Sequence, residues 1–179
     1  MSQGELLSAT DVTPASSLAD TLLALNNEHA RELSWLTPER LAHLVGEAFL
    51  ARRIGQVDAF LLAFDQGAEY DSPNFLWFRA RYERFVYVDR IVVASAARGR
   101  GLARLLYCAL FAEAARAGHS RVVCEVNSEP PNPASDAFHA ALGFAKVGSA
   151  SLHDGKTVRY LLRRLDDYAA VAGGSASTE

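Results

Sequence analysis

The feature that most constrains this chain is the order of elements predicted for residues 85–117. Residues 85–93 are rich in β-branched and aromatic side chains, which is typical of a buried strand. Residues 102–117 repeat apolar side chains at the spacing of an amphipathic helix, at Leu102, Leu105, Leu106, Ala109 and Leu110. Gly118 then provides a helix stop signal. The segment therefore predicts a strand, a turn and a helix.

The turn between this strand and helix has the chemistry of an anion-binding site. The first N–H groups of a helix have no partner within the helix, and the helix dipole is positive there. Gly99 and Gly101 lack the Cβ that would hold a phosphate away from these amides. Arg98 and Arg100 add planar cationic donors. The turn favours a pyrophosphate ligand, and the alternative is a plain turn with solvated arginines.

Two common phosphate-binding loops do not fit this turn. A Walker loop ends in Gly-Lys-Ser or Gly-Lys-Thr, whereas Gly101 is followed by Leu102 and Ala103. The dinucleotide fingerprint needs a third small residue at the position that Arg104 occupies, where helix and strand must pack closely. These two classes of phosphate-binding loop can therefore be set aside.

The turn Arg98-Gly99-Arg100-Gly101-Leu102-Ala103 resembles the acetyl-CoA loop of the GNAT acyltransferases, usually written Arg/Gln-x-x-Gly-x-Gly/Ala. A second segment, residues 132–144 from Asn132 to Gly143-Phe144, resembles the family's Asn-x-x-Ala-x-x-Phe-Tyr-x-x-x-Gly-Phe segment. The two segments have the family's order and separation, and the resemblance covers residues 85–165. It implies an α/β (α+β) fold in which helices flank a mixed, mostly antiparallel sheet with splayed central parallel strands.

Composition sets limits on the class of protein. A chain of 179 residues with 50% hydrophobic and 22% charged residues is typical of one soluble domain, expected at residues 1–165 with a disordered tail at 166–179. The net charge of -3 does not favour a nucleic-acid surface. Cys108 and Cys124 are expected to be reduced core residues. No apolar run is long enough for a membrane span and no signal peptide is recognisable, so we expect a cytoplasmic protein.

The remaining chain yields further expected elements. Thr13 and Thr37 are candidate helix caps, each followed by proline at the first helical position. We expect helices at 14–27 and 38–47, and a short helix that begins at residue 133 or 135 and ends at 143. We expect strands at 5–12, 48–54, 59–64, 121–127, 145–151 and 156–163, the last two joined by a turn at 153–155.

Residues 65–84 fit neither a clean helix nor a clean strand. Large aromatic side chains alternate there with polar turn residues. Long irregular loops are often functional, so we expect this segment to form the lid or wall of an acceptor pocket. The candidate acceptor-binding residues are Asn27, Tyr70, Asn74, Phe75 and Trp77. The alternative is a loop that its aromatic residues pin to the core, with Asn27 at an exposed helix end.

The resemblance implies an acyltransferase that moves an acetyl group from acetyl-CoA to a primary amine of a small molecule or peptide by direct transfer. It implies a monomer or homodimer without metal, nucleic acid or membrane partner. The expected acetyl-CoA contacts are Ile91, Val92, Val93, Arg98, Gly99, Arg100, Gly101, Leu102, Ala103, Asn127, Asn132 and Ser135. An N–H group of strand 85–93 would stabilise the oxyanion of the tetrahedral intermediate.

An attacking amine must lose a proton, so a base is needed. Asp89 and Glu125 are candidates because each is acidic within an apolar run and, by the resemblance, lies near the reacting centre. Either one can instead form an ion pair, for instance with Arg90 or Arg121. His139 stands where the family usually carries a tyrosine acid, and it can act as acid or base or be structural. The missing tyrosine leaves a non-catalytic acyl-CoA-binding or sensing module as the rival function.

Overall fold

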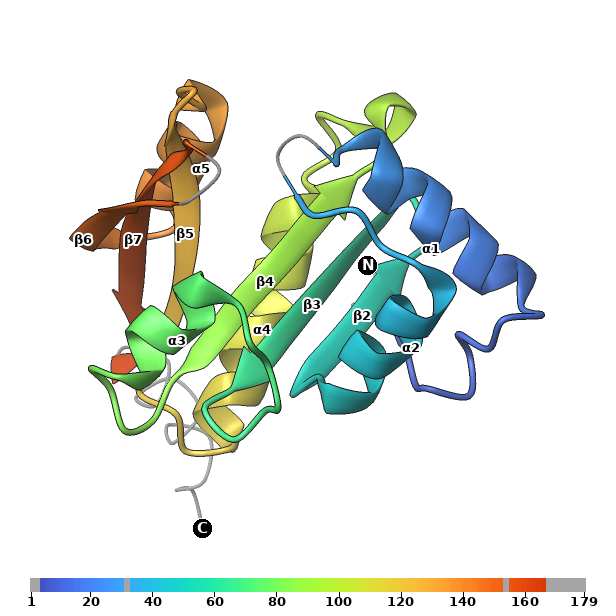
Figure 1. The fold of residues 1–179 in the computed structure, drawn as a ribbon, viewed down its shortest axis with the longest axis horizontal. Helices are drawn as coiled ribbons and strands as arrows, with labels where there is room; N and C mark the ends of the chain where they lie inside the picture. The colour runs from blue at the N-terminus through green and yellow to red at the C-terminus, as the bar shows by residue number, and fades with distance from the viewer. Residues whose placement is uncertain (1–3, 31–32, 153–154, 167–179) are drawn as a thin grey trace, which may run out of the picture. The chain divides into compact units, whose positions relative to one another are not determined.

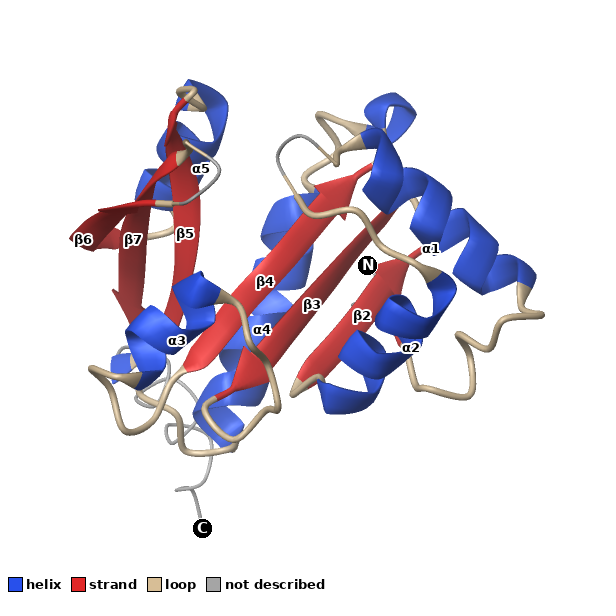
Figure 2. Cartoon of the chain, viewed as in Figure 1, coloured by secondary structure: helices blue, strands red, loops and turns tan. Residues whose placement is uncertain are grey.

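The computed structural model describes residues 4–30, 33–152 and 155–166. The helices are α1 (Ser17–Glu28), α2 (Pro38–Glu47), α3 (Pro73–Arg79), α4 (Leu102–Arg116) and α5 (Pro133–Ala141), with a short 3-10 helix at Ser95–Ala97. The strands are β1 (Glu5–Leu6), β2 (Leu50–Ile54), β3 (Ala59–Asp65), β4 (Val86–Val93), β5 (Arg121–Glu129), β6 (Ala145–Ser151) and β7 (Thr157–Arg164). Figures 1 and 2 show these elements.

The strands form one mixed sheet in the order β1-β2-β3-β4-β5-β7-β6. β4 and β5 pair in parallel, with Val86 opposite Val122 and Tyr87 opposite Val123. The pairings β1–β2, β2–β3, β5–β7 and β6–β7 are antiparallel. The predicted α/β fold with a mixed, mostly antiparallel sheet is confirmed.

The chain divides into two compact units. The first comprises Met1–Asp71 with Val88–Leu110, and the second comprises Ser72–Tyr87 with Phe111–Glu179. The boundaries fall within β4 and α4, so each of these elements contributes residues to both units.

In the first unit, α1 and α2 lie on one face of β2 and β3, and α4 lies on the other face (Figure 1). The hairpin β2–β3 supplies much of the core, because residues 59–64 are all buried. Thr37 caps α2 as predicted, since its hydroxyl oxygen accepts a hydrogen bond from the Arg40 N–H at 3.2 Å, and Pro38 is the first helical residue. Local sequence signals thus determine where α2 begins.

Two predictions for the N-terminal segment are wrong. The helix expected from residue 14 begins at Ser17, and its cap is Ser16, whose hydroxyl oxygen accepts from the Ala19 N–H. Thr13 instead accepts the Ser16 N–H with its carbonyl, within a turn that precedes the helix. The strand expected at 5–12 is only Glu5–Leu6, because a hydrogen-bonded turn from Ser8 to Asp11 ends it.

In the second unit, β7 lies between β5 and β6. The predicted closing hairpin β6–β7 is confirmed, although His153 and Asp154 of its expected turn lie outside the described residues. Helix α5 begins at Pro133, one of the two predicted starts, and Asn132 caps it by accepting from the Ser135 N–H at 3.2 Å. The expected tail at 166–179 lies outside the described residues except for residue 166.

The prediction that residues 65–84 form an irregular loop is wrong in part, because the segment contains α3. This helix buries Phe75 and Phe78 completely in an aromatic cluster with Phe85 and Tyr87. Trp77 stacks on the Tyr160 ring of β7, with 4.1 Å between ring centroids. Aromatic contacts with distant strands therefore stabilise a short helix that its own sequence signals only weakly.

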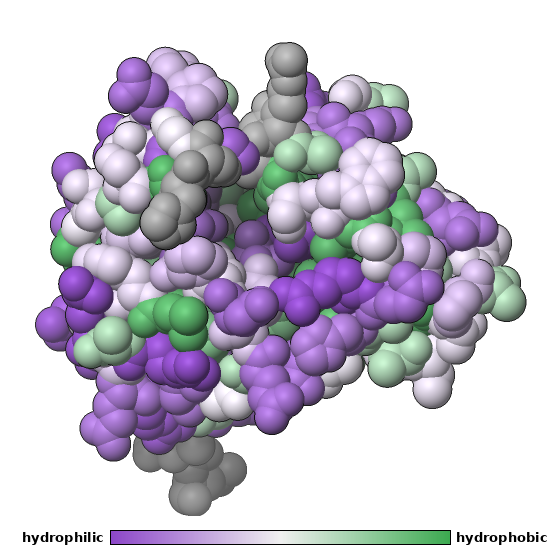
Figure 3. Space-filling model, in the orientation of Figure 1, coloured by the Kyte–Doolittle hydropathy of each residue, from purple (hydrophilic) through white to green (hydrophobic). Residues whose placement is uncertain are grey.

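The surface agrees with the composition of the chain. Hydrophilic side chains (purple) cover much of the face in Figure 3, with hydrophobic groups (green) between them. Among the described residues the large exposed apolar side chains are Leu6, Trp35, Leu76 and Val147.

Both cysteines are free thiols, but Cys108 is exposed rather than in the core, whereas Cys124 is buried as expected. No described helix has the length and apolar character of a membrane span.

Candidate functional site

The predicted anion-binding turn has the backbone geometry that its glycines permit. Gly99 and Gly101 adopt φ angles of +76° and +74°, in the left-handed region that favours glycine. The first backbone hydrogen bond into α4 is from the Leu105 N–H to the Gly101 carbonyl at 3.0 Å. The amides of Leu102 and Ala103 therefore precede the helical hydrogen-bond ladder and are available to an anion.

The surroundings of this turn fit a diphosphate. A Cβ at Gly99 or Gly101 would have no heavy atom within 4 Å, so the space in front of both residues is open to a ligand. Arg98 and Arg100 are exposed, and Arg100 forms a 3.0 Å ion pair with Asp58, which is also partly exposed. Such a pair is weak in water, so Arg100 can turn to a phosphate at little cost. The turn therefore offers amide and guanidinium donors of the kind that bind phosphate.

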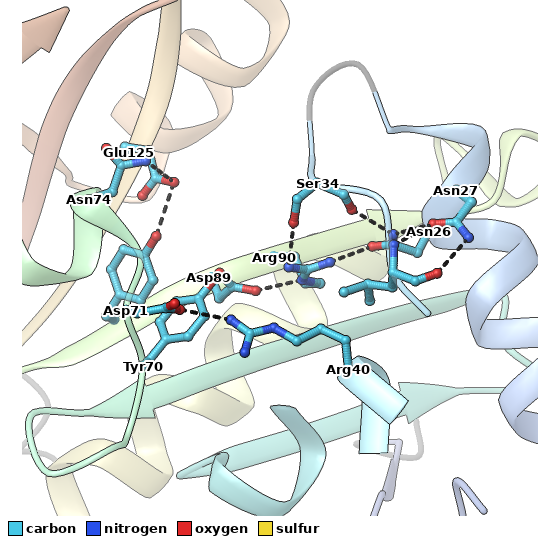
Figure 4. Close-up of polar contacts among 12 residues, drawn as sticks. Asn26, Asn27, Ser34, Arg40, Tyr70, Asp71, Asn74, Asp89, Arg90 and Glu125 are labelled. Carbon is cyan, nitrogen blue, oxygen red and sulfur yellow. Dashed lines mark hydrogen bonds and ion pairs between the residues drawn. The ribbon is translucent and has the colours of Figure 1, made fainter. Parts of the chain in front are cut away.

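Asp89 of β4 lies at the centre of a buried polar network in the first unit (Figure 4). One carboxylate oxygen accepts from the Tyr70 hydroxyl at 2.5 Å, and the other pairs with the Arg90 guanidinium at 2.5 Å. The side chains of Asp89 and Arg90 are only 5% and 2% exposed. The ion pair that the sequence left open for Asp89 is thus formed with Arg90.

Arg90 extends this network to the segment between α1 and α2. Its other nitrogens donate to the Asn26 Oδ1 at 2.7 Å and to the Ser34 hydroxyl at 3.3 Å. Burial lowers the pKa of Arg90, but the Asp89 carboxylate and the Tyr70 hydroxyl outweigh burial, and the net shift is upward. Arg90 is therefore a permanent cation that holds the α1–α2 segment against β4.

Asn27 anchors the same segment rather than forming an exposed helix end. Its side chain accepts from the Leu36 N–H at 2.9 Å and donates to the Leu36 carbonyl at 3.0 Å. The neighbouring Asn26 donates to the Ser34 carbonyl at 3.0 Å and is completely buried. The amides of these two asparagines fix the backbone on both sides of Trp35, whose side chain remains 68% exposed.

Glu125 of β5 lies in a separate network within the second unit. Its Oε1 accepts from the Tyr87 hydroxyl at 3.0 Å and from the Asn74 side-chain amide at 3.1 Å (Figure 4). The Tyr160 hydroxyl donates to the Asn74 Oδ1 at 3.0 Å, which turns the Asn74 amide nitrogen toward Glu125. Burial raises the pKa of Tyr160, and the charge of Glu125 raises it further against the opposing effect of Arg81. Tyr160 therefore stays a hydrogen-bond donor.

His139 of α5 is only 5% exposed. Its Nδ1–H donates to the Ser135 carbonyl at 2.7 Å, and the Ser135 hydroxyl lies 3.2 Å from the same nitrogen. Burial lowers the pKa of His139, whereas the bond to Ser135 and the charge of Asp136 raise it by less. The ring packs edge-on against Phe138 and Phe144. These contacts hold the ring in place, and the lowered pKa favours its neutral form.

Comparison with known families decides the class of protein. Residues 21–144 match the model of the acetyltransferase (GNAT) family. The chain belongs to this GNAT family. The acetyl-CoA turn and the 132–144 segment of the sequence both resemble GNAT motifs, so the resemblance noted above is confirmed. No curated protein sequence matches the chain.

Solved structures of GNAT proteins share the fold at low sequence identity. Ard1 from Thermoplasma volcanium has a TM-score of 0.67 at 14% identity, over 89% of this chain and 95% of that protein. The ribosomal-protein-S18-alanine N-acetyltransferase of Escherichia coli has a TM-score of 0.60 at 19% identity, over 90% of this chain and 92% of that protein. The acetyltransferase yncA of Salmonella typhimurium, solved with its cofactor acetyl-CoA, has a TM-score of 0.60 at 17% identity, over 92% of this chain and 94% of that protein. The TM-scores establish the shared fold, and identities this low leave the acceptor open.

The structure distributes the other predicted site residues among several environments. Tyr70 donates a hydrogen bond to Asp89, and Asn74 donates one to Glu125, as described above. Phe75 is completely buried, and Trp77 lies between the Tyr160 ring and the Arg81 guanidinium. Ile91 and Val93 are half-buried on one face of β4, and Val92 is buried on the other. Asn127 pairs with Val158 just before a register shift in β5.

Sequence reasoning missed Asn26, Tyr87 and Tyr160 as members of these networks. Tyr87 had a readable signal, because it lies two residues before Asp89 in a predicted buried strand and a buried tyrosine hydroxyl needs a partner. Asn26 and Tyr160 had none, since their partners lie far away in the sequence.

Proposed function

We propose that the chain is an N-acetyltransferase that uses acetyl-CoA and moves the acetyl group directly to a primary amine of a small molecule or peptide. Acetyl-CoA supplies an activated thioester acetyl group when it is bound. The amides and arginines of residues 98–103 would bind its pyrophosphate, and Ile91 and Val93 would offer backbone groups of β4 to the rest of the cofactor. A β4 N–H group would polarise the thioester carbonyl.

Glu125 is the base in this proposal, and the contrast with Asp89 carries the choice. Protonation of Asp89 would break its 2.5 Å ion pair and leave the Arg90 guanidinium buried without its counter-charge. The hydroxyl of Tyr87 and the amide of Asn74, which bind Glu125, are neutral donors, and both can remain in place when the carboxylate takes up a proton. Glu125 is thus the carboxylate better suited to accept a proton from the acceptor amine.

Asp89 then has a positioning role. Its carboxylate fixes Arg90, and Arg90 fixes the segment that carries Ser34. His139 has no acid role in this proposal, because burial favours its neutral form and its Nδ1–H is bonded to the Ser135 carbonyl. CoA would leave as the thiolate, which is a fair leaving group without an acid.

The cofactor site is tested by titration calorimetry with acetyl-CoA. Gly101→Glu places a carboxylate where phosphate would bind, so binding should be lost. Gly101→Asn tolerates the left-handed backbone without a charge and should bind more tightly than Gly101→Glu. Gly46→Glu is the matched control, because a side chain at this exposed position of α2 meets no neighbour within 4 Å. Absence of wild-type binding would refute the proposal.

A measurement of turnover distinguishes the enzyme from a non-catalytic acyl-CoA-binding module. The binding module is favoured by the lack of a tyrosine acid at the position of His139. Once a screen of primary amines with acetyl-CoA has identified an acceptor, Glu125→Gln should lower kcat by about 100-fold or more and leave acetyl-CoA binding intact. Tight binding without turnover of any amine would support the binding module instead. A Glu125→Gln variant with full kcat would exclude Glu125 as the base.

A further inference from the structure

A cavity of about 730 Å³ lies in the second unit, around the end of α5, the first residues of β5 and β6, and the last residues of β7. Its walls include the arginines Arg121, Arg163 and Arg164, the ring of Tyr82, and the aliphatic side chains of Leu142 and Leu162. All ten lining residues belong to the described part of this unit, and none of them is an aspartate or glutamate. None belongs to the predicted acetyl-CoA or acceptor sites. The cavity is therefore a separate, positively charged feature.

Two of these arginines face each other in the sheet. Arg121 of β5 is directly opposite Arg164 of β7 in the antiparallel register. Side chains of a directly opposed pair point to the same face at close range, and like charges at such positions are destabilising. Asp166 lies 3.7 Å from Arg164, and because both side chains are more than half exposed, solvent weakens this contact and the repulsion between the two arginines alike. A bound anion would neutralise the pair.

Two of the three cationic groups are also held in place before any ligand binds, whereas Arg164 is largely exposed. The Arg121 guanidinium lies over the Tyr82 ring, 5.1 Å from its centroid. The Arg163 guanidinium lies over the Phe111 ring at 4.4 Å and donates a hydrogen bond to the Leu142 carbonyl. Stacked guanidinium groups lose little conformational freedom on binding, which favours recognition of a planar or tetrahedral anion.

We propose that this cavity binds a small organic anion, in which a phosphate or carboxylate head is attached to an apolar body. Arg121 and Arg164 bind the head, Arg163 adds positive charge, and Tyr82 and Leu162 contact the body. The volume lies within the range of small-molecule sites, which combine apolar walls with a few polar groups. The inference does not depend on the proposed acetyl transfer.

Calorimetry at fixed low ionic strength tests this site in the full chain, with phenyl phosphate and benzoate as the two anionic probes and phenol as the neutral one. At least one anion should bind the wild type, and the better one identifies the head group. Arg121→Gln and Arg164→Gln should each weaken binding about tenfold, as expected for loss of a charged hydrogen bond. Arg116→Gln, an exposed α4 arginine outside the cavity, is the matched control and should bind normally.

The Gly101→Glu variant distinguishes this cavity from the acetyl-CoA turn, because it should bind the probe as the wild type does. Thermal unfolding gives a second readout. Without the probe, Arg164→Gln should unfold no lower than the wild type, since the substitution removes a repulsion. With the probe, the wild type should gain more in Tm than this variant. Failure of both anions to bind, unchanged binding by the Arg121 and Arg164 variants, or loss of binding in Gly101→Glu would overturn the proposal.

Discussion

The buried pair of Asp89 and Arg90 supports a quantitative prediction for Arg90→Met. Methionine keeps much of the volume but leaves the Asp89 carboxylate, only 5% exposed, without its cation. Removal of one partner of a buried ion pair costs about 3–5 kcal/mol in the free energy of unfolding. The variant also loses the hydrogen bonds to Asn26 and Ser34, so we expect a value near the upper end, about 4–5 kcal/mol.

Urea unfolding followed by tryptophan fluorescence and far-UV circular dichroism measures this loss, provided that the two transitions coincide. For a chain of this size 4 kcal/mol corresponds to a fall in Tm of roughly 8–16 °C. Arg116→Met is the control, because the ion pair of Arg116 with Glu113 is on the surface, with Arg116 70% exposed, and should cost about 0–1 kcal/mol.

The double variant Asp89→Asn/Arg90→Met isolates the effect of the stranded charge. An amide in place of the carboxylate removes the uncompensated buried charge, so the double variant should be about 1–3 kcal/mol more stable than Arg90→Met alone. Two results would refute the reasoning: a cost for Arg90→Met no larger than that for Arg116→Met, or no recovery in the double variant.

Three further predictions follow from contacts described above. Burial lowers the pKa of His139 below its ordinary 6.5, so the folded state binds a proton less readily than the unfolded chain. The contribution of His139 to stability is therefore complete above about pH 6.5 and declines as the pH falls toward the folded pKa. In urea unfolding at a series of pH values, His139→Gln should flatten this decline in the free energy of unfolding. A Cβ in Gly148→Ala would lie 2.5 Å from the Trp77 ring, which Tyr160 and Arg81 confine, so the variant should lose about 1–3 kcal/mol and shift the tryptophan fluorescence; an unchanged spectrum would contradict this. Asn27→Ala should speed hydrogen exchange of the Leu36 amide at least about tenfold, while that of Leu41 in α2 stays unchanged.

The elements that the sequence predicted well are those with local signals. Thr37 and Pro38 define the start of α2 through a side-chain cap and a fixed φ angle, both of which act within one turn. β4 and α4 are long enough for their periodicity to be unambiguous. By contrast, α3 has only seven residues, and its aromatic side chains pack on residues such as Tyr160, so its spacing did not reveal it, although Pro73 after Ser72 is a helix-start signal.

The candidate site was predictable to a similar extent. The turn at residues 98–103, which is the proposed acetyl-CoA site, is contiguous, so its glycines and arginines are visible in the sequence. The Asp89–Arg90 pair joins neighbouring residues, and the sequence allowed it as an alternative. The contact of Glu125 with Asn74 could not be predicted, because Asn74 is 51 residues away and lies on a helix that the sequence signals only weakly. Side-chain networks between distant segments depend on tertiary packing.

The Asp89–Arg90 pair also restricts how this sequence can diverge. A neutral residue at either position alone leaves the other charge buried, so a lineage that changes them one at a time passes through an unstable intermediate. We therefore expect relatives with this network to change the two positions together, and Asn26, whose amide oxygen serves Arg90, to vary with them. Relatives with an apolar residue at position 90 should lack a carboxylate at position 89.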